Sequence, residues 1–155
     1  MSSPASIGKH PIHPMLIVFP IGLWIFSLVC DFIYHAGAHN EFWKGVAFYT
    51  MMGGVIGALF AAVPGFIDYL SLRERRIKKI ATTHMVLNLI VVALFLFNLG
   101  IRYDAGPDNE VFGVFLSIAA IAILGVSGWL GGSLVYVHGV AVEPPSSKED
   151  YRRAA

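Results

Sequence analysis

The feature that most constrains this chain is a series of four long apolar runs, at about residues 14–34, 43–70, 80–101 and 111–138. Each run reaches the roughly 20 residues that an α-helix needs to cross the hydrocarbon core of a bilayer. Lipid offers no partners for backbone polar groups, so such runs form helices rather than open strands. We therefore predict an all-α, multi-pass protein with four transmembrane helices.

The composition agrees with a membrane protein. Of the 155 residues, 56% are hydrophobic and only 14% are charged, which is too little polar surface to cover a soluble globule of this size. The formal net charge of +1 argues against nucleic acid as the main partner, because nucleic-acid binding needs basic patches. The only cysteine, Cys30, lies within the first run, so the chain has neither an internal disulfide nor a cysteine-based metal site.

The loops predict the topology. Residues 73–79 carry the densest positive cluster and should be cytoplasmic, whereas the acidic loop after Arg102 should lie outside. Four spans then place both termini in the cytoplasm, and short connections favour an up-down-up-down bundle. Residues 1–142 form one transmembrane domain and residues 143–155 a flexible polar tail. The two halves show no evident sequence repeat.

Proline and glycine indicate where the helices bend and pack. Pro20 lies inside the first run and predicts a kink, because it leaves the carbonyl of Leu16 without its helical donor. Two Gly-x-x-x-Gly motifs, Gly53 to Gly57 and Gly128 to Gly132, predict close helix packing within the bundle or in a homo-oligomer.

Histidine and aspartate gather at the predicted cytoplasmic ends of all four helices. The residues concerned are His10, His13, Asp68, His84 and His138. Imidazole is a common ligand of haem iron and of zinc, copper and non-haem iron. We therefore predict a redox or metal cofactor at the cytoplasmic face.

A b-type haem for electron transfer is the preferred cofactor. His84 and His138 approach the membrane boundary on consecutive antiparallel helices and are the predicted axial ligands. Gly131 would leave room for the macrocycle beneath His138, while Asn88 or Asp68 would orient a ligand through its second ring nitrogen. The basic segment would pair with the propionates, and a redox protein would be the partner.

Three alternatives follow from the same residues. A divalent metal ion would use His10, His13, Asp68, His84 and His138 as ligands. A cofactor-free scaffold or assembly subunit would use the glycine faces and leave the histidines merely interfacial. Ion or proton handling is less favoured because no charge occupies the middle of a span; Asp31, with His35 one turn away, lies at the outer end.

Together, these motifs resemble a known family over residues 9–142. They are His10-Pro11-x-His13-Pro14, Pro20-Ile21-Gly22, Pro64-Gly65-x-x-Asp68, His84 with Asn88, and Gly128-Trp129-x-Gly131-Gly132 leading to His138. The chain resembles the bacterial membrane family known as domain of unknown function 2231. The resemblance implies a small multi-pass protein of the bacterial inner membrane. Some members of that family are joined to Rieske iron–sulfur domains, which implies a redox setting, but this chain lacks the two cysteines of a Rieske cluster.

Overall fold

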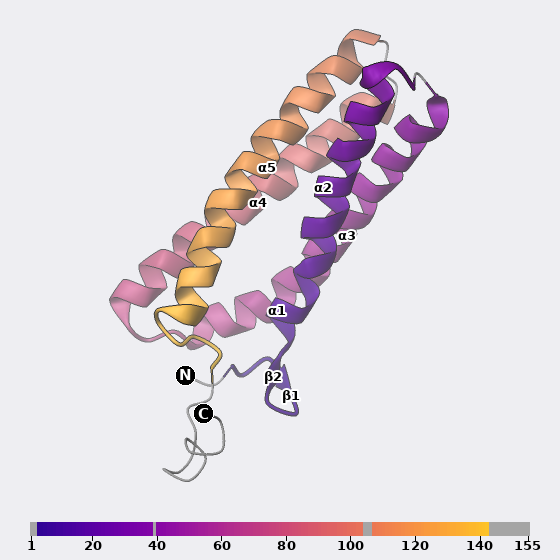
Figure 1. The fold of residues 1–155 in the computed structure, drawn as a ribbon. Helices are drawn as coiled ribbons and strands as arrows, with labels where there is room; N and C mark the ends of the chain where they lie inside the picture. The colour runs from indigo at the N-terminus through magenta and orange to yellow at the C-terminus, as the bar shows by residue number, and fades with distance from the viewer. Residues whose placement is uncertain (1–2, 39, 104–106, 143–155) are drawn as a thin grey trace.

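The computed structural model describes residues 3–38, 40–103 and 107–142, and most of them are helical (Figure 1). In chain order the helices are α1 (Ile12–Leu16), α2 (Val18–Ile33), the π-helical turn η1 (Tyr34–Ala38), α3 (Glu41–Ser71), α4 (Arg75–Tyr103) and α5 (Pro107–Tyr136). Four helical stretches are long and apolar enough to cross a membrane, with α1, α2 and η1 counting as one. The predicted all-α class with four spans is confirmed, while the predicted tail lies outside the described residues.

The first helix is preceded by a small hairpin that the sequence analysis did not predict. Strand β1 (Ser6–Ile7) pairs antiparallel with β2 (His10–Pro11). Gly8 and Lys9 form the turn with φ angles of 55° and 70°, the left-handed conformation that a tight two-residue hairpin turn uses. The amide of Ile12 then donates to the carbonyl of Ala5 at 3.0 Å, which ties the hairpin to the start of α1.

The predicted bend in the first span lies between α1 and α2. The two helices meet at Ile17, three residues before Pro20. Pro20 has no N–H to donate, so the ladder of helical hydrogen bonds is interrupted at this level. The short α1 packs against α3, and this contact brings His13 to the second span.

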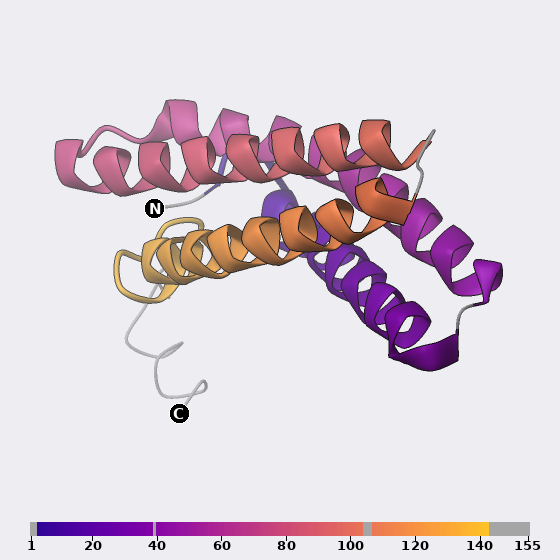
Figure 2. The same ribbon diagram turned by 90° about the horizontal axis from the view of Figure 1, so that it is seen from above.

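The four spans pack as two antiparallel pairs, α2 with α3 and α4 with α5 (Figure 1). Within the first pair, Trp24 Nε1 donates to the carbonyl of Met51 and Ser27 Oγ donates to that of Ala47. Seen from above, the two pairs cross at an angle rather than lying parallel (Figure 2). The loop between them is shorter than predicted, because α4 begins at Arg75, inside the basic cluster.

Residues at equivalent positions of the two pairs meet one another. Three contacts join residues that are 71 positions apart: His13 with His84, Trp24 with Phe95, and Asp31 with Arg102. These contacts follow one another along the first and third spans, so those spans run in the same direction. An approximate two-fold axis therefore runs along the bundle between two similar helical hairpins. The first and second spans form one hairpin, and the third and fourth spans form the other.

The hydrogen-bond acceptors in the second and fourth spans are also related by a constant offset in the sequence. Ser27 donates to the carbonyl of Ala47 and Asn98 donates to that of Gly113, acceptors that lie 66 positions apart (47 to 113). The chain thus contains a structural repeat, although its halves show no evident repeat in sequence.

The middle of the bundle is held by an aromatic stack on this axis. The rings of Trp24 and Phe95 lie 4.5 Å apart at 13° to each other, and both side chains are buried. Gly54 allows this packing, because a Cβ at that position would lie 2.5 Å from Trp24 Cδ1. Stacked aromatic rings contribute about 0.5–1.5 kcal/mol beyond the area that they bury.

A buried ion pair closes the end of the bundle opposite to His13. Arg102 donates to both carboxylate oxygens of Asp31, at 2.6 and 2.7 Å, and its Nε donates to Asn98 Oδ1 at 2.8 Å. The Asp31 and Arg102 side chains are 4% and 10% exposed. Asp31 therefore has Arg102 from another span as its partner, and not His35 one turn away.

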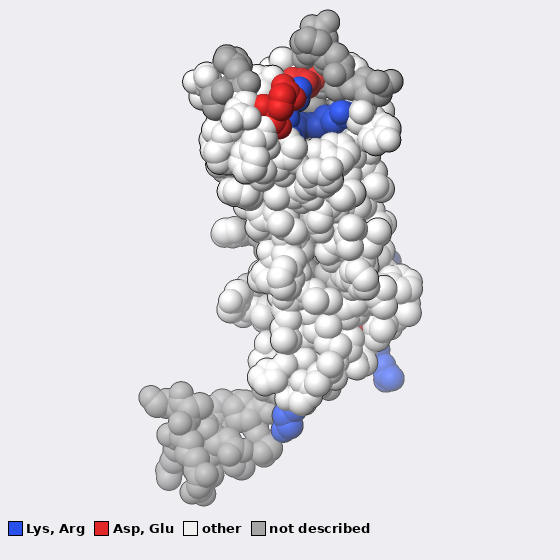
Figure 3. All heavy atoms as spheres, turned by 90° about the vertical axis from the view of Figure 1, so that its right-hand side faces the viewer, with Lys and Arg blue, Asp and Glu red and all other residues white. Residues whose placement is uncertain are grey.

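Charged side chains are concentrated at the ends of the molecule. In Figure 3 the surface between the ends is almost free of charge, while acidic and basic groups meet at the Arg102 end. Many large apolar side chains of the four spans are exposed, including Phe60, Phe97 and Phe115, each more than half exposed. Such a surface matches the acyl chains of a bilayer.

Candidate functional site

His13 is held between the first and second spans. Its Nδ1 lies 2.8 Å from the carbonyl oxygen of Ala61. Its ring packs directly on Gly65, where a Cβ would come within 2.7 Å of the same nitrogen. Pro64, between these two residues, has no N–H and interrupts the hydrogen-bond ladder of α3 beside Ala61.

His84 has the same surroundings in the second hairpin. Its Nδ1 lies 2.8 Å from the carbonyl oxygen of Ser127, and its ring packs on Gly131, where a Cβ would lie 2.9 Å from Cε1. The acceptors Ala61 and Ser127 are 66 positions apart (61 to 127), as are the two glycines (65 to 131). Each hairpin therefore supplies a similar half-site of imidazole, main-chain acceptor and glycine.

The two imidazoles meet on the approximate two-fold axis. Their ring centroids are 6.4 Å apart and their planes stand at 88° to each other. A carbonyl oxygen can only accept, so each Nδ1 donates to its carbonyl, and in a neutral imidazole the lone pair then lies on Nε2. This is the tautomer in which a histidine binds a metal through Nε2 while its other nitrogen is fixed by a carbonyl.

Asn88 makes the two halves unequal. Its Nδ2 donates to His84 Nε2 at 3.1 Å and also lies 2.9 Å from the carbonyl oxygen of His84. The residue 71 positions earlier is Ile17, whose apolar side chain offers no such donor. Asn88 was predicted to orient a ligand histidine through its second ring nitrogen. It contacts Nε2 of His84, whereas Nδ1 is bonded to the carbonyl of Ser127.

Asp68 serves a different part of the chain. Its Oδ1 accepts a hydrogen bond from Ser3 Oγ at 2.6 Å and another from the amide of Ala5 at 3.2 Å. Ser3 and Ala5 are largely buried. These hydrogen bonds of Asp68 thus fasten the N-terminal segment to the end of α3.

The other predicted ligands are placed apart from this pair. His10 lies in β2 and is exposed, while His138 follows the end of α5 and is half-buried, with its amide bonded to the carbonyl of Ser133 at 3.1 Å. Gly131, expected beneath His138, instead packs against His84. Within residues 3–38, 40–103 and 107–142, no three His, Cys, Asp or Glu side chains form a group able to hold a metal ion.

The preferred haem prediction paired His84 with His138, and His13 stood beside His84 only in the metal-ion alternative. The role of Gly65 was missed. One signal was available: His13 and His84 each stand in the first turns of a span, and Gly65 and Gly131 each stand near the end of the following span. The hydrogen-bond acceptors left no signal, because a main-chain carbonyl is present whatever the side chain.

Comparison with known proteins gives a family. No curated protein and no solved structure is detectably similar to the chain. The family model described as "Predicted membrane protein (DUF2231)" matches residues 9–144, which include both hairpins and the histidine pair. The chain therefore belongs to the DUF2231 family of membrane proteins.

Proposed function

We propose that His13 and His84 bind a b-type haem between the two hairpins and that the protein carries electrons within the membrane. The observation that supports this best is the meeting of two similar half-sites on one axis. Haem presents two faces to the protein, and one imidazole on each face is a common form of ligation. This assignment keeps the haem predicted from the sequence and replaces His138 with His13.

The dimensions of the pair fit one metal between two rings. Two imidazoles bound on opposite sides of a metal, at about 2 Å each, have ring centres roughly 6 Å apart. The observed separation of 6.4 Å is close to that value. Gly65 and Gly131 keep side-chain atoms away from both rings, so each ring can lie close to its helix.

The number of ligands favours haem over a bare metal ion. A structural zinc site needs four protein ligands and a catalytic one needs three. The described residues bring two imidazoles together without a third His, Cys, Asp or Glu. Haem supplies four nitrogens of its own and needs only the two axial ligands.

Asn88 has to release His84 Nε2 before this nitrogen binds iron. The amide already has a second acceptor in the carbonyl oxygen of His84, so it retains one hydrogen bond after it turns away. Haem iron, when bound, would take up and release one electron, and a redox protein at the predicted cytoplasmic face would exchange it.

The test is an optical spectrum of protein purified from cells supplied with a haem precursor and iron. We expect a Soret band that sharpens and shifts on reduction with dithionite, and loss of the band in both His13→Ala and His84→Ala. His138→Ala is the matched control and should keep it. A colourless protein with stoichiometric zinc, copper or iron would favour the metal ion, and a colourless, metal-free protein would favour the scaffold.

A further inference from the structure

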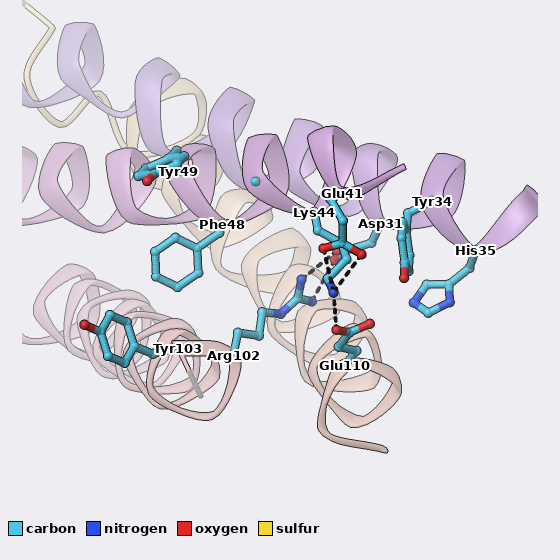
Figure 4. A pocket seen from close by; sticks show the side chains of 11 residues that line it. Asp31, Tyr34, His35, Glu41, Lys44, Phe48, Tyr49, Arg102, Tyr103 and Glu110 are labelled. Atoms are coloured by element: carbon cyan, nitrogen blue, oxygen red, sulfur yellow. Dashed lines mark hydrogen bonds and ion pairs between the residues drawn. The ribbon is translucent and has the colours of Figure 1, made fainter. Parts of the chain in front are cut away.

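A polar pocket lies at the Arg102 end of the bundle (Figure 4). Its volume is about 340 Å³. Its charged lining comes from all four spans: Asp31 of α2, Glu41 and Lys44 of α3, Arg102 of α4 and Glu110 of α5.

The described charges of this pocket leave one carboxylate in excess. Arg102 is matched by Asp31 in a two-fold hydrogen-bonded pair. Lys44 is shared by two carboxylates, since its Nζ pairs with Glu110 and lies 3.0 Å from Glu41. Three carboxylates thus face two cations, and Glu41, whose side chain is 75% exposed, is free to accept from a further donor. The pocket favours a cationic or zwitterionic group over an anion.

Aromatic rings complete the lining. Tyr34, Phe48, Tyr49 and Tyr103 border the pocket together with the charged groups. The ring of Tyr34 already faces a cation, because Lys44 Nζ lies 5.4 Å from its centroid. Aromatic faces beside carboxylates form a common site for an organic ammonium ion.

An apolar hollow continues from the pocket along α3. It is lined by Phe42, Gly45, Val46, Tyr49 and Thr50, and it shares Gly45 and Tyr49 with the polar pocket. Phe42 and Tyr49 are 63% and 66% exposed. A polar head in the pocket therefore has an adjoining apolar surface for its tail, on the side of α3 that would face lipid.

We propose that this pocket binds a phospholipid whose headgroup ends in a primary ammonium group. The ammonium has three N–H donors, which suit the carboxylates of Glu41 and Glu110, and an acyl chain suits the hollow beside Phe42. The charge excess and the aromatic rings select the head, and the hollow selects an amphiphile over a soluble amine. The proposal does not depend on haem binding at His13 and His84.

The test is native mass spectrometry of the full chain in detergent with equal amounts of phosphatidylethanolamine, phosphatidylcholine and phosphatidylglycerol of distinguishable acyl mass. We expect phosphatidylethanolamine to be retained roughly fivefold over phosphatidylglycerol, since only the former carries an ammonium group that can pair with the carboxylates. Glu110→Gln should abolish this preference, and Glu74→Gln, an exposed glutamate at the opposite end, should leave it unchanged.

Lys44→Gln provides a test in the opposite direction. It removes the cation that competes for Glu41 and Glu110, so it should strengthen the preference for phosphatidylethanolamine. Equal retention of the three lipids, a weaker preference in Lys44→Gln, or equal effects of Glu110→Gln and Glu74→Gln would overturn the proposal. So would displacement of the lipid by an equal concentration of soluble phosphoethanolamine, because the tail would then be irrelevant.

Discussion

The ion pair of Asp31 with Arg102 gives the most quantitative prediction for this bundle. Replacing Arg102 with Met should lower the free energy of unfolding by about 3–5 kcal/mol, because it leaves a buried carboxylate without its counter-charge. We expect a loss of about 5 kcal/mol, the upper end of this range, since Asp31 is only 4% exposed and loses two short hydrogen bonds at once. Asn98 loses a donor as well.

The double variant Asp31→Leu with Arg102→Met should be far less destabilised than the single one. Replacing both partners removes the charge together with its counter-charge, and such replacements are often close to neutral. The coupling energy of the double-mutant cycle should therefore be at least about 2 kcal/mol. The exchange Asp31→Arg with Arg102→Asp should also recover part of the loss, since the two positions are equivalent about the axis.

These free energies are measurable by reversible unfolding in mixed micelles of a mild detergent and dodecyl sulfate. The fluorescence of the three tryptophans reports the transition. A loss below about 1 kcal/mol for Arg102→Met would mean that water or detergent reaches the pair as it does at a surface. A double variant whose loss of stability equals the sum of the losses of its single variants would show that Asp31 and Arg102 are not energetically coupled.

Two close contacts and one open position give three further predictions. Gly54→Ala should cost about 1–3 kcal/mol in the same unfolding assay and shift the emission of Trp24, because the new methyl group overlaps the indole; unchanged emission would contradict the packing. Gly128→Ala should change stability by less than about 0.5 kcal/mol, since no neighbouring atom lies within 4 Å, and a large loss in the monomer would show an unrecognised contact. Asp68→Asn should speed proteolysis near Ser3 without unfolding the spans, as a protease time course with mass spectrometry would show; an unchanged cleavage rate would mean that this carboxylate does not hold the segment.

The fold class was predictable from the sequence because the length and hydropathy of a span are properties of one segment. The positions of the four spans and the bend near Pro20 follow from local rules. The small N-terminal hairpin was less accessible. Its turn is formed by Gly8 and Lys9, and a lysine in the left-handed conformation carries no strong sequence signal.

The structural repeat was difficult to predict from the sequence, because several of its equivalent contacts use main-chain carbonyl groups, which do not depend on residue type. Ser27 and Asn98 occupy equivalent positions, and each donates a hydrogen bond to a carbonyl of the next span although their side chains differ. Asp31 and Arg102 are equivalent in position but opposite in charge, so no similarity scale would align them. Among the residues that make the contacts named above, only the histidines and the glycines beneath them are the same in both halves.

The site was predictable in its residue types and not in its pairing. His84 and Asn88 were expected to act together because they lie one turn apart on a helix. The meeting of His13 with His84 depends on how two hairpins cross, which no local pattern specifies. His138 seemed equivalent to His84 in depth, yet the helix α5 ends before it.

The most direct test of haem binding by His13 and His84 is the electron paramagnetic resonance spectrum of the oxidised protein loaded with haem. Two imidazoles whose planes stand near 88° should give a low-spin ferric signal of the highly anisotropic type, which is typical of nearly perpendicular axial rings. His13→Ala and His84→Ala should each convert it to a different ligand state, while His138→Ala should preserve it. A low-spin signal that survives in His13→Ala, or haem that never binds, would contradict the assignment of this pair.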